Sequence, residues 1–435
     1  MTRRTMLYLL ADAPRGDPAG GAALEEVAMA TLVGIVLVAL LAAFGAAHRA
    51  ERTQLLTRLA AFAERVSNIP RWAALPAAVA GGSLAIAAFG FYADVASHID
   101  EGRDPGPFAN PYHYLIIVGL LGIGLAGYLS VLIGAGEDDP ARVRVRPGWS
   151  APAAGVLMLL CGAIAVLGFP LDDTWHRLFG QDVTLWSPTH VQMVGGASLS
   201  TLALWALLSE AGQHGHGDGS LLHRLRGPFV AGAFLIGLSA MHAEFDYGVP
   251  QFRLLYQPVL LVLSAAVALV PARICLGRGG ALKTVVVFLG IRGLLTLAIG
   301  PVLGHTLLHF PLYLVEALVV EAVAARLPRE RQLTLGAWAG AGIGTVGLAT
   351  EWLWSHVWMP LPWPAALLPE AAVPSSPGFR VGCWGGISRV HSVLGISPCR
   401  WGPAGWVSRP PPACSSLSHT PSPPTHASAR RRRSG

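Results

Sequence analysis

Charged residues are scarce in this sequence. Asp, Glu, Lys and Arg make up only 13% of its 435 residues, while 53% are apolar and the mean hydropathy is +0.50. A soluble domain typically carries about a quarter charged residues and cannot hide so large an apolar share in its interior. The composition therefore excludes a soluble globular protein and indicates a chain that is solvated mainly by lipid.

Lysine is almost absent and cysteine is rare. Lys283 is the single lysine among 31 basic residues, and the basic residues are scattered between apolar runs except for Arg430 to Arg433. A nucleic-acid partner needs a basic surface patch, so the net charge of +6 does not predict one. The five cysteines suggest neither a disulfide framework nor a C-x-x-C site. Scarce lysine beside abundant Ala, Gly, Pro and Arg indicates a GC-rich bacterial gene.

Several enzyme signatures are missing as well. The sequence has no phosphate-cradling G-x-x-x-x-G-K-[ST], no G-x-S-x-G nucleophile turn and no H-E-x-x-H zinc-protease motif. We therefore predict no catalytic residues and no organic cofactor site.

Long apolar runs, by contrast, fill most of the chain. A membrane-spanning helix needs about 17 to 25 such residues, and each span must be helical because unpaired backbone groups in lipid cost several kcal/mol. The sequence predicts an all-α, polytopic transmembrane bundle of about ten spans, within a domain at 27–373 that follows an N-terminal segment at 1–26. The expected spans are 27–47, 73–95, 112–134, 150–170, 189–209, 228–246, 256–272, 284–302, 311–326 and 333–352.

The C-terminal part breaks this pattern. Residues 374–435 are rich in Ser, Pro and Arg and have no periodicity, which is typical of disorder. Our hypothesis is that this tail is a frameshifted end that replaces an eleventh span.

The spans form repeated helical hairpins. Five loops that carry acids or histidines each end an apolar run, and a Pro at or near the first position opens the next run. Asn110 and Ser187 are the expected N-caps of two of these returning helices, so His113 and His190 fall in the first turns. Aligning the loops by their acids places Asp94, Asp172, Glu244 and Glu351 at one equivalent position. One helical turn later, three of the loops have His98, His176 and His356.

The distribution of basic residues predicts the orientation. Sixteen Arg and Lys residues lie in or beside one set of alternating loops, and only Arg103, Arg177 and Arg253 lie in the other set. Because basic loops stay in the cytoplasm, the acid and histidine loops are expected to face outward. Arg3, Arg4 and Arg15 on the outer N-terminus oppose this bias. Residues 48–67 are typical of a basic amphipathic helix on the inner leaflet or a partner-docking helix.

The outer loops carry the candidate metal ligands. Asp94 with His98, and Asp172 with His176, are four residues apart at helix ends, so each pair shares a face. Imidazole nitrogens with carboxylate oxygens are ligands of Zn, Cu or Fe. The sequence predicts a metal site, for copper or another transition metal, at Asp94, His98, His113, Asp172, His176 and His190. The alternative is a structural network in which Arg103, Arg177 and Arg253 neutralise the acids.

Two resemblances accompany this pattern. Asp172-x-x-x-His176 followed by His190 resembles the D-x3-H-x12-H metal motif in the C subunit of copper membrane monooxygenases, the particulate methane and ammonia monooxygenase family, although the second gap here is thirteen residues. It implies that Asp172, His176 and His190 are copper ligands near the outer face. The whole chain is also similar to an uncharacterised family of polytopic membrane proteins from actinobacteria, which implies no activity.

Charged residues also occur inside predicted spans. Arg292, Glu316 and Glu321 lie at matching depths in neighbouring antiparallel helices, so Arg292 is expected to pair with one of the two glutamates. Such a pair either fixes the two helices or belongs to a proton or ion pathway.

Together these patterns predict a multi-pass protein of the bacterial plasma membrane that binds or handles a transition metal on its outer side. A transporter or channel for a small solute or ion is the second hypothesis, and a membrane scaffold or complex subunit is the third. The lipid bilayer is the expected partner. A membrane-complex partner or a homo-oligomer is compatible with the sequence.

Overall fold

The computed structural model describes residues 21–104, 106–134, 141–180, 184–212 and 221–372, all within one compact unit. In these residues nine helical segments are long and apolar enough to cross a membrane. They are Leu24–Arg49 (α2), Arg71–Glu101 (α4), Pro111–Ile133 (α5), Ala153–Phe179 (α6), Pro188–Gly212 (α7), Arg224–Asp246, Tyr256–Leu276 (α10), Gly280–Val302 and Gln332–Val357. The all-α, polytopic architecture is thereby confirmed.

Three of these spans contain a 3-10 or π-helical turn. The first consists of Leu221–Ser239 (α8), the 3-10 turn Ala240–His242 (η1) and Ala243–Asp246 (α9). The second joins Gly280–Leu297 (α11) to a π-helical turn at Ala298–Val302 (η2). The third joins Gln332–Gly342 (α13) through a π-helical turn at Ile343–Gly347 (η3) to Leu348–Val357 (α14).

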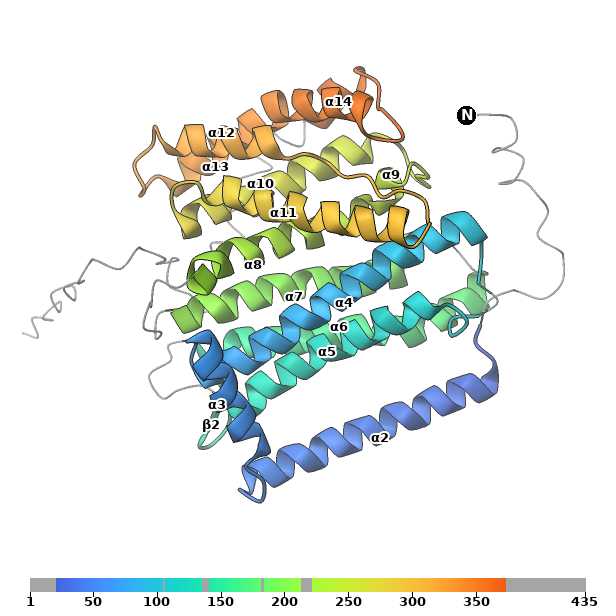
Figure 1. Cartoon of the computed structure of the whole chain (residues 1–435), viewed down its shortest axis with the longest axis vertical. Helices are drawn as coiled ribbons and strands as arrows, with labels where there is room; N and C mark the ends of the chain where they lie inside the picture. Colours follow the sequence, from blue (N-terminus) through green and yellow to red (C-terminus); the bar gives the residue numbers. More distant parts are fainter. Residues whose placement is uncertain (1–20, 105, 135–140, 181–183, 213–220, 373–435) are drawn as a thin grey trace, which may run out of the picture. The chain divides into compact units, whose positions relative to one another are not determined.

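Helices that follow one another in the sequence lie side by side, as Figure 1 shows for α4 and α5 and for α6 and α7. The turn chemistry explains the first hairpin. Gly102, with a φ of 91°, ends α4, and Pro111 opens α5 behind the N-cap Asn110, whose side-chain oxygen accepts from the Tyr112 backbone N–H at 2.9 Å. In the second hairpin Gly180, with a φ of 85°, ends α6, and Pro188 opens α7.

Small residues let these helices approach closely. A Cβ added to Gly162 of α6 would lie 2.5 Å from the backbone N of Gly124 in α5. At the α6–α7 contact, a Cβ on Gly196 would lie 2.8 Å from the carbonyl oxygen of Cys161. Lipid supplies no hydrophobic force between helices, so this close van der Waals packing holds the hairpins together.

Within the predicted amphipathic segment at 48–67, only 55–67 form a separate helix, Leu55–Ser67 (α3), whereas His48 and Arg49 end α2. Leu56 and Ala60 on one face are buried, and Leu56 packs with the core residues Leu129 and Leu132. A second apolar stripe is exposed, consisting of Leu55, Leu59, Phe62 and Val66. This spacing suits a helix that lies on a membrane surface, and its placement on the inner leaflet stays a prediction.

The structure also contains a small β-hairpin that was not predicted from the sequence. Arg142–Arg146 (β1) pairs antiparallel with Trp149–Pro152 (β2) between α5 and α6. Alternating Arg and Val in β1 is the period of a strand. Trp149 donates from its ring N–H to Val131 O at 2.9 Å, which fastens the hairpin to the end of α5.

The ninth predicted span, 311–326, is not a full span. Its helix Leu314–Ala324 (α12) has only 11 residues, and residues 303–313 before it are not helical. Eleven residues rise about 16 Å, roughly half the hydrocarbon thickness. This explains why nine rather than ten full-length spans are seen in the described residues.

The last described element is the short helix Leu367–Ala372 (α15). The tail at 374–435 and most of the N-terminal segment at 1–26 lie outside the described residues.

Candidate metal centre

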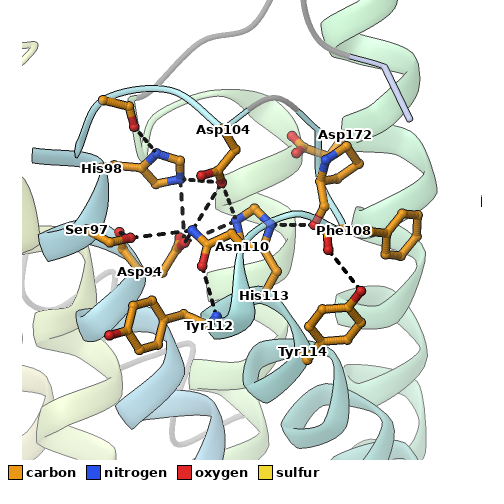
Figure 2. Close-up of polar contacts among 12 residues, drawn as sticks. Asp94, Ser97, His98, Asp104, Phe108, Asn110, Tyr112, His113, Tyr114 and Asp172 are labelled. Atoms are coloured by element: carbon orange, nitrogen blue, oxygen red, sulfur yellow. Dashed lines mark hydrogen bonds and ion pairs between the residues drawn. The ribbon is translucent and has the colours of Figure 1, made fainter. Parts of the chain in front are cut away.

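Four of the chain's acids and histidines converge at the turn between α4 and α5. The first group consists of Asp94 and His98 on α4, Asp104 in the turn and His113 in the first turn of α5, and one ligand atom from each lies within 4.8 Å of the others. His113 Nε2 lies 3.1 Å from Asp94 Oδ1, and His98 Nε2 lies 3.4 Å from Asp104 Oδ2. Figure 2 shows both imidazoles pointing toward the two carboxylates.

Asn110 organises the first group. Its side-chain NH2 donates to Asp94 Oδ1 at 2.6 Å and to Asp104 Oδ2 at 3.1 Å, while its oxygen caps α5 (Figure 2). The N-cap of one helix therefore fixes a carboxylate on the preceding helix and another in the turn.

The second group repeats this arrangement at the turn between α6 and α7. Asp172 and His176 lie on α6 and His190 lies in the first turn of α7, again with ligand atoms within 4.8 Å of one another. Asp172 Oδ1 is 3.4 Å from His190 Nε2, and Asp172 Oδ2 is 3.7 Å from His176 Nε2. Thr189 donates its hydroxyl to Asp172 Oδ1 at 2.5 Å and so takes the place that Asn110 has in the first group.

The proton positions of three histidines follow from their partners. Nδ1 lies 3.0 Å from Gly102 O in His98, 2.7 Å from Pro107 O in His113 and 2.6 Å from Thr184 O in His190. A carbonyl oxygen only accepts, so each Nδ1 carries the hydrogen. In the neutral imidazole Nε2 then has a lone pair, which is directed at a carboxylate. A lone pair that faces a carboxylate requires either a second ring proton or a cation between them.

The two groups are partly shielded from water. The side chains of Asp94 and Asp172 are 14% and 15% exposed, and that of His176 is 11% exposed. Phe169 of α6 packs edge-on against His113 with 6.3 Å between the ring centres, so an apolar side chain of the second hairpin borders the first group. Partial burial strengthens the interaction of the carboxylates with any cation between the ligands.

The structure brings the six sequence-predicted residues into these two groups and adds Asp104, which the sequence analysis missed. Asp104 lies in the GRDPG turn, six residues before the N-cap of α5, where nothing in helical spacing points to it. Its position could have been inferred only from the side-chain NH2 of Asn110, which has two hydrogens and needs an acceptor besides Asp94.

The other two acids of the alignment, Glu244 and Glu351, lie outside the two groups. Glu244 is buried and its carboxylate accepts from Thr184 Oγ1, the Leu185 N–H and the Gln251 N–H at 2.7, 2.7 and 2.9 Å. It therefore holds the loop between α6 and α7 against α9. Glu351 lies inside the bundle near the N-terminus of α12.

Three other histidines, His305, His356 and His309, have contacts outside the two groups. His305 Nδ1 lies 3.0 Å from Asp100 and its Nε2 lies 2.9 Å from the Tyr112 hydroxyl. His356 Nδ1 lies 2.9 Å from Trp352 O. His309 packs edge-on against Trp358, and burial lowers its pKa.

Arg177 does not neutralise Asp172 in the way the structural alternative expected. Its Nε donates to Asp173 at 2.8 Å, and its guanidinium also donates to Ala22 O. Asp173 in turn accepts from the Ala22 backbone N–H at 2.6 Å. This neighbouring acid therefore anchors the start of α2, and Asp172 contacts His176, His190 and Thr189 instead.

The expected pairing of Arg292 with Glu316 or Glu321 is wrong. Arg292 donates to Asp246 Oδ2 at 2.5 Å, and Glu321 instead pairs with Arg273 at 2.8 Å. Glu321 also caps α11 by accepting from the N–H groups of Gly279 and Ala281 at 2.9 and 3.0 Å. The expected pairing requires a full-length straight span at 311–326, whereas α12 is a half-length helix whose Glu316 packs on η3.

The comparisons with known proteins identify no relative. No protein-family model, no curated protein and no solved structure matches this chain. The site and its function therefore rest on the chemistry of the chain itself, which is that of a multi-pass membrane protein with two Asp/His groups that could hold a metal ion.

Proposed function

We propose that this protein binds a transition-metal ion at each of its two Asp/His groups. One observation carries the proposal: His98, His113 and His190 each direct Nδ1 to a backbone carbonyl and Nε2 to a carboxylate oxygen. Metal-ligating histidines have this arrangement, because the bond at one nitrogen fixes the ring while the other nitrogen binds the metal.

The ligand sets favour a borderline divalent ion. The first group offers two imidazoles and two carboxylates, which balance a charge of +2, and the second offers two imidazoles and one carboxylate. Mg²⁺ and Ca²⁺ prefer oxygen ligands, whereas Zn²⁺, Cu²⁺ and Fe²⁺ bind mixed nitrogen and oxygen sets. Four protein ligands suit a closed site and three leave an open position, so we assign retention of the ion to the first group and exchange of an external ligand to the second.

Copper is the ion that the resemblance to the monooxygenase C subunit favours at Asp172, His176 and His190. On that basis we propose a role in binding or handling copper, as a subunit or assembly partner of a copper system. The distribution of basic residues supports an outward-facing site in the bacterial plasma membrane.

The competing account is a metal-free network in which the histidines are doubly protonated and pair with the carboxylates. Metal analysis of the full chain, purified in detergent, separates the two accounts. The protein is equilibrated with Cu²⁺ or Zn²⁺, desalted and compared with two double variants, His98→Ala with His113→Ala and His176→Ala with His190→Ala. We expect the wild type to retain about two ions per chain and each double variant to lose about one.

His305→Ala with His356→Ala is the matched control, because both residues lie at the same end of the bundle and outside the two groups. This control should retain the wild-type amount. A wild type that retains no ion, or double variants that retain as much as the wild type, would support the metal-free network.

A further inference from the structure

Helix α12 begins inside the bundle. The chain from 303 to 313 is not helical, and Tyr313, the residue before α12, is fully buried with a left-handed φ of 53°. Helices α10, α11 and α13, which all belong to membrane spans, pack against α12. The first N–H groups of a helix have no partner within the helix, so this buried N-terminus needs acceptors.

Glu351 of α14 supplies the acceptors. Its Oε1 accepts from the Tyr313 N–H at 2.6 Å and from the Leu312 N–H at 3.0 Å, and its Oε2 lies 3.2 Å from the same Leu312 nitrogen. The residue is only 3% exposed. The two N–H donors and the positive end of the α12 dipole favour the ionised form of the Glu351 carboxylate.

Glu316 lies in the first turn of α12 and is also 3% exposed. Its Oε2 has no hydrogen-bond partner among the residues that the structure describes. A Cβ added to Gly347, the last residue of η3, would lie 2.8 Å from Glu316 Cγ and 2.9 Å from Oε1, so Glu316 rests on the Gly347 backbone. Gly347 and Glu351 are four residues apart on one helix face, which places the two carboxyl groups on the same side of this helix, where they interact electrostatically.

The charged groups on the surrounding elements do not neutralise this pair. Arg292 of α11 is bound to Asp246 of α9, and Arg273 of α10 is bound to Glu321, five residues further along α12. The Arg292–Asp246 pair has no net charge and so supplies no cation to the two glutamates. Gly347 lies ten residues, about 15 Å, before the end of its span, well inside the hydrocarbon layer.

Two neighbouring carboxylates in such surroundings cannot both be ionised. We propose that Glu316 and Glu351 form an intramembrane proton-binding site, in which Glu316 holds the proton and Glu351 stays ionised. The ligand is a proton exchanged with water: it leaves as hydronium from the Glu316 carboxyl, which becomes a carboxylate, and it returns to the same group.

This site belongs to the transport hypothesis and is independent of the metal centre. A carboxyl group that takes up and releases a proton within the membrane is the working part of proton-coupled transporters. Transporters also place such groups where a helix begins within the membrane, as here at the start of α12.

Infrared spectroscopy of the full chain in lipid nanodiscs tests the protonation of Glu316. The spectrum of Glu316→Gln is subtracted from that of the wild type at neutral pH, in H2O and in D2O. We expect the difference to contain the carbonyl stretch of a protonated carboxylic acid, shifted in D2O. Glu370→Gln, at an exposed residue of α15, is the control and should remove carboxylate bands instead. Loss of carboxylate bands in Glu316→Gln would overturn the proposal.

A chemical readout on the wild-type protein does not depend on a variant that folds. Dicyclohexylcarbodiimide modifies protonated carboxyl groups in apolar surroundings, and mass spectrometry locates the modified residue. We expect modification of Glu316, not of Glu351, with a yield that falls as pH rises. Modification of Glu351 alone, no modification of either residue, or protection by Na⁺ with no dependence on pH would each overturn the proposal, the last by indicating an alkali-cation site.

Discussion

Arg292 and Asp246 form an ion pair with exposed fractions of only 0% and 1%. The Arg292 guanidinium also donates to His309 O at 2.9 Å and lies over the Tyr92 ring, 4.4 Å from its centre. Its Nε and Nη1 have no hydrogen-bond partner among the described residues. Removing both charges from water has a large desolvation cost, and the attraction between the two partners offsets part of it.

Removing one partner of this pair should therefore be worse than removing both. We expect Arg292→Met to lower the free energy of unfolding by about 3 to 5 kcal/mol, because it leaves the Asp246 carboxylate buried without a cation. Arg292→Met combined with Asp246→Leu should recover a large part of the loss. Thermal unfolding in detergent measures both, with the exposed Arg103→Met as the control. A double variant less stable than the single variant would contradict this view of the pair.

Single residues also set the limit of what the sequence predicts about the site. Asp94 with His98 and Asp172 with His176 were predictable because four-residue spacing on a helix fixes a shared face. His113 and His190 followed from the Pro and cap residues that fix the start of the returning helix. Asp104 and Asp246 were not predictable, because one lies in an irregular turn and the other acts through a helix far away in the sequence.

At the scale of the element, helix α7 carries two adjacent glycines with different surroundings. A Cβ on Gly196 would lie 2.8 Å from Cys161 O and 2.9 Å from the Ala165 Cβ, both in α6, whereas a Cβ on Gly195 meets nothing within 4 Å. The two residues share the same helical backbone, so a comparison between them isolates helix packing from helix propensity.

Gly196→Ala should push α6 away from α7, at a cost of about 1 to 3 kcal/mol for overpacking against backbone. Gly195→Ala should leave stability unchanged or raise it by up to about 1 kcal/mol, because Ala has the better helix propensity. Thermal unfolding in detergent measures the stability of the two variants. The amount of retained metal measures whether the Asp/His group between α6 and α7 is intact. Equal stability of the two variants would show that the α6–α7 contact is looser than the distances indicate.

Helix α12 shows that hydropathy alone does not predict the length of a helix. Its segment is apolar enough to count as a span, yet the helix has 11 residues because Glu351 offers the backbone of Leu312 and Tyr313 a partner outside the helix. Hydropathy indicates which residues avoid water, but it carries no information on which acceptor binds a given backbone N–H.

For the whole molecule, orientation is the prediction on which the metal proposal depends. The turns with the two Asp/His groups join α4 to α5 and α6 to α7, whereas the Arg-rich β1 lies at the opposite end of α5. Because basic segments stay in the cytoplasm, the Asp/His turns should open to the outside.

Cysteine labelling of intact cells measures this orientation. Arg103→Cys, at an exposed residue of the α4–α5 turn, should react with a membrane-impermeant maleimide in intact cells. Arg144→Cys, at an exposed residue of β1, should react only after permeabilisation. The wild-type protein gives the background from its native cysteines. Labelling of Arg144→Cys alone in intact cells would reverse the orientation and place the proposed metal sites in the cytoplasm.

The sequence by itself determined that the chain crosses a membrane many times as helical hairpins, because the cost of unpaired backbone in lipid leaves a long apolar run little alternative. It also determined the two sets of Asp and His, since helical spacing and N-caps are local properties. Only the tertiary structure decided the partners of Arg292, Glu321 and Glu351, because those depend on which helix faces lie together and where α12 begins. Helical spacing and N-caps depend on residues that are close in the sequence, whereas the pairing of buried charges depends on packing between helices that are distant in the sequence.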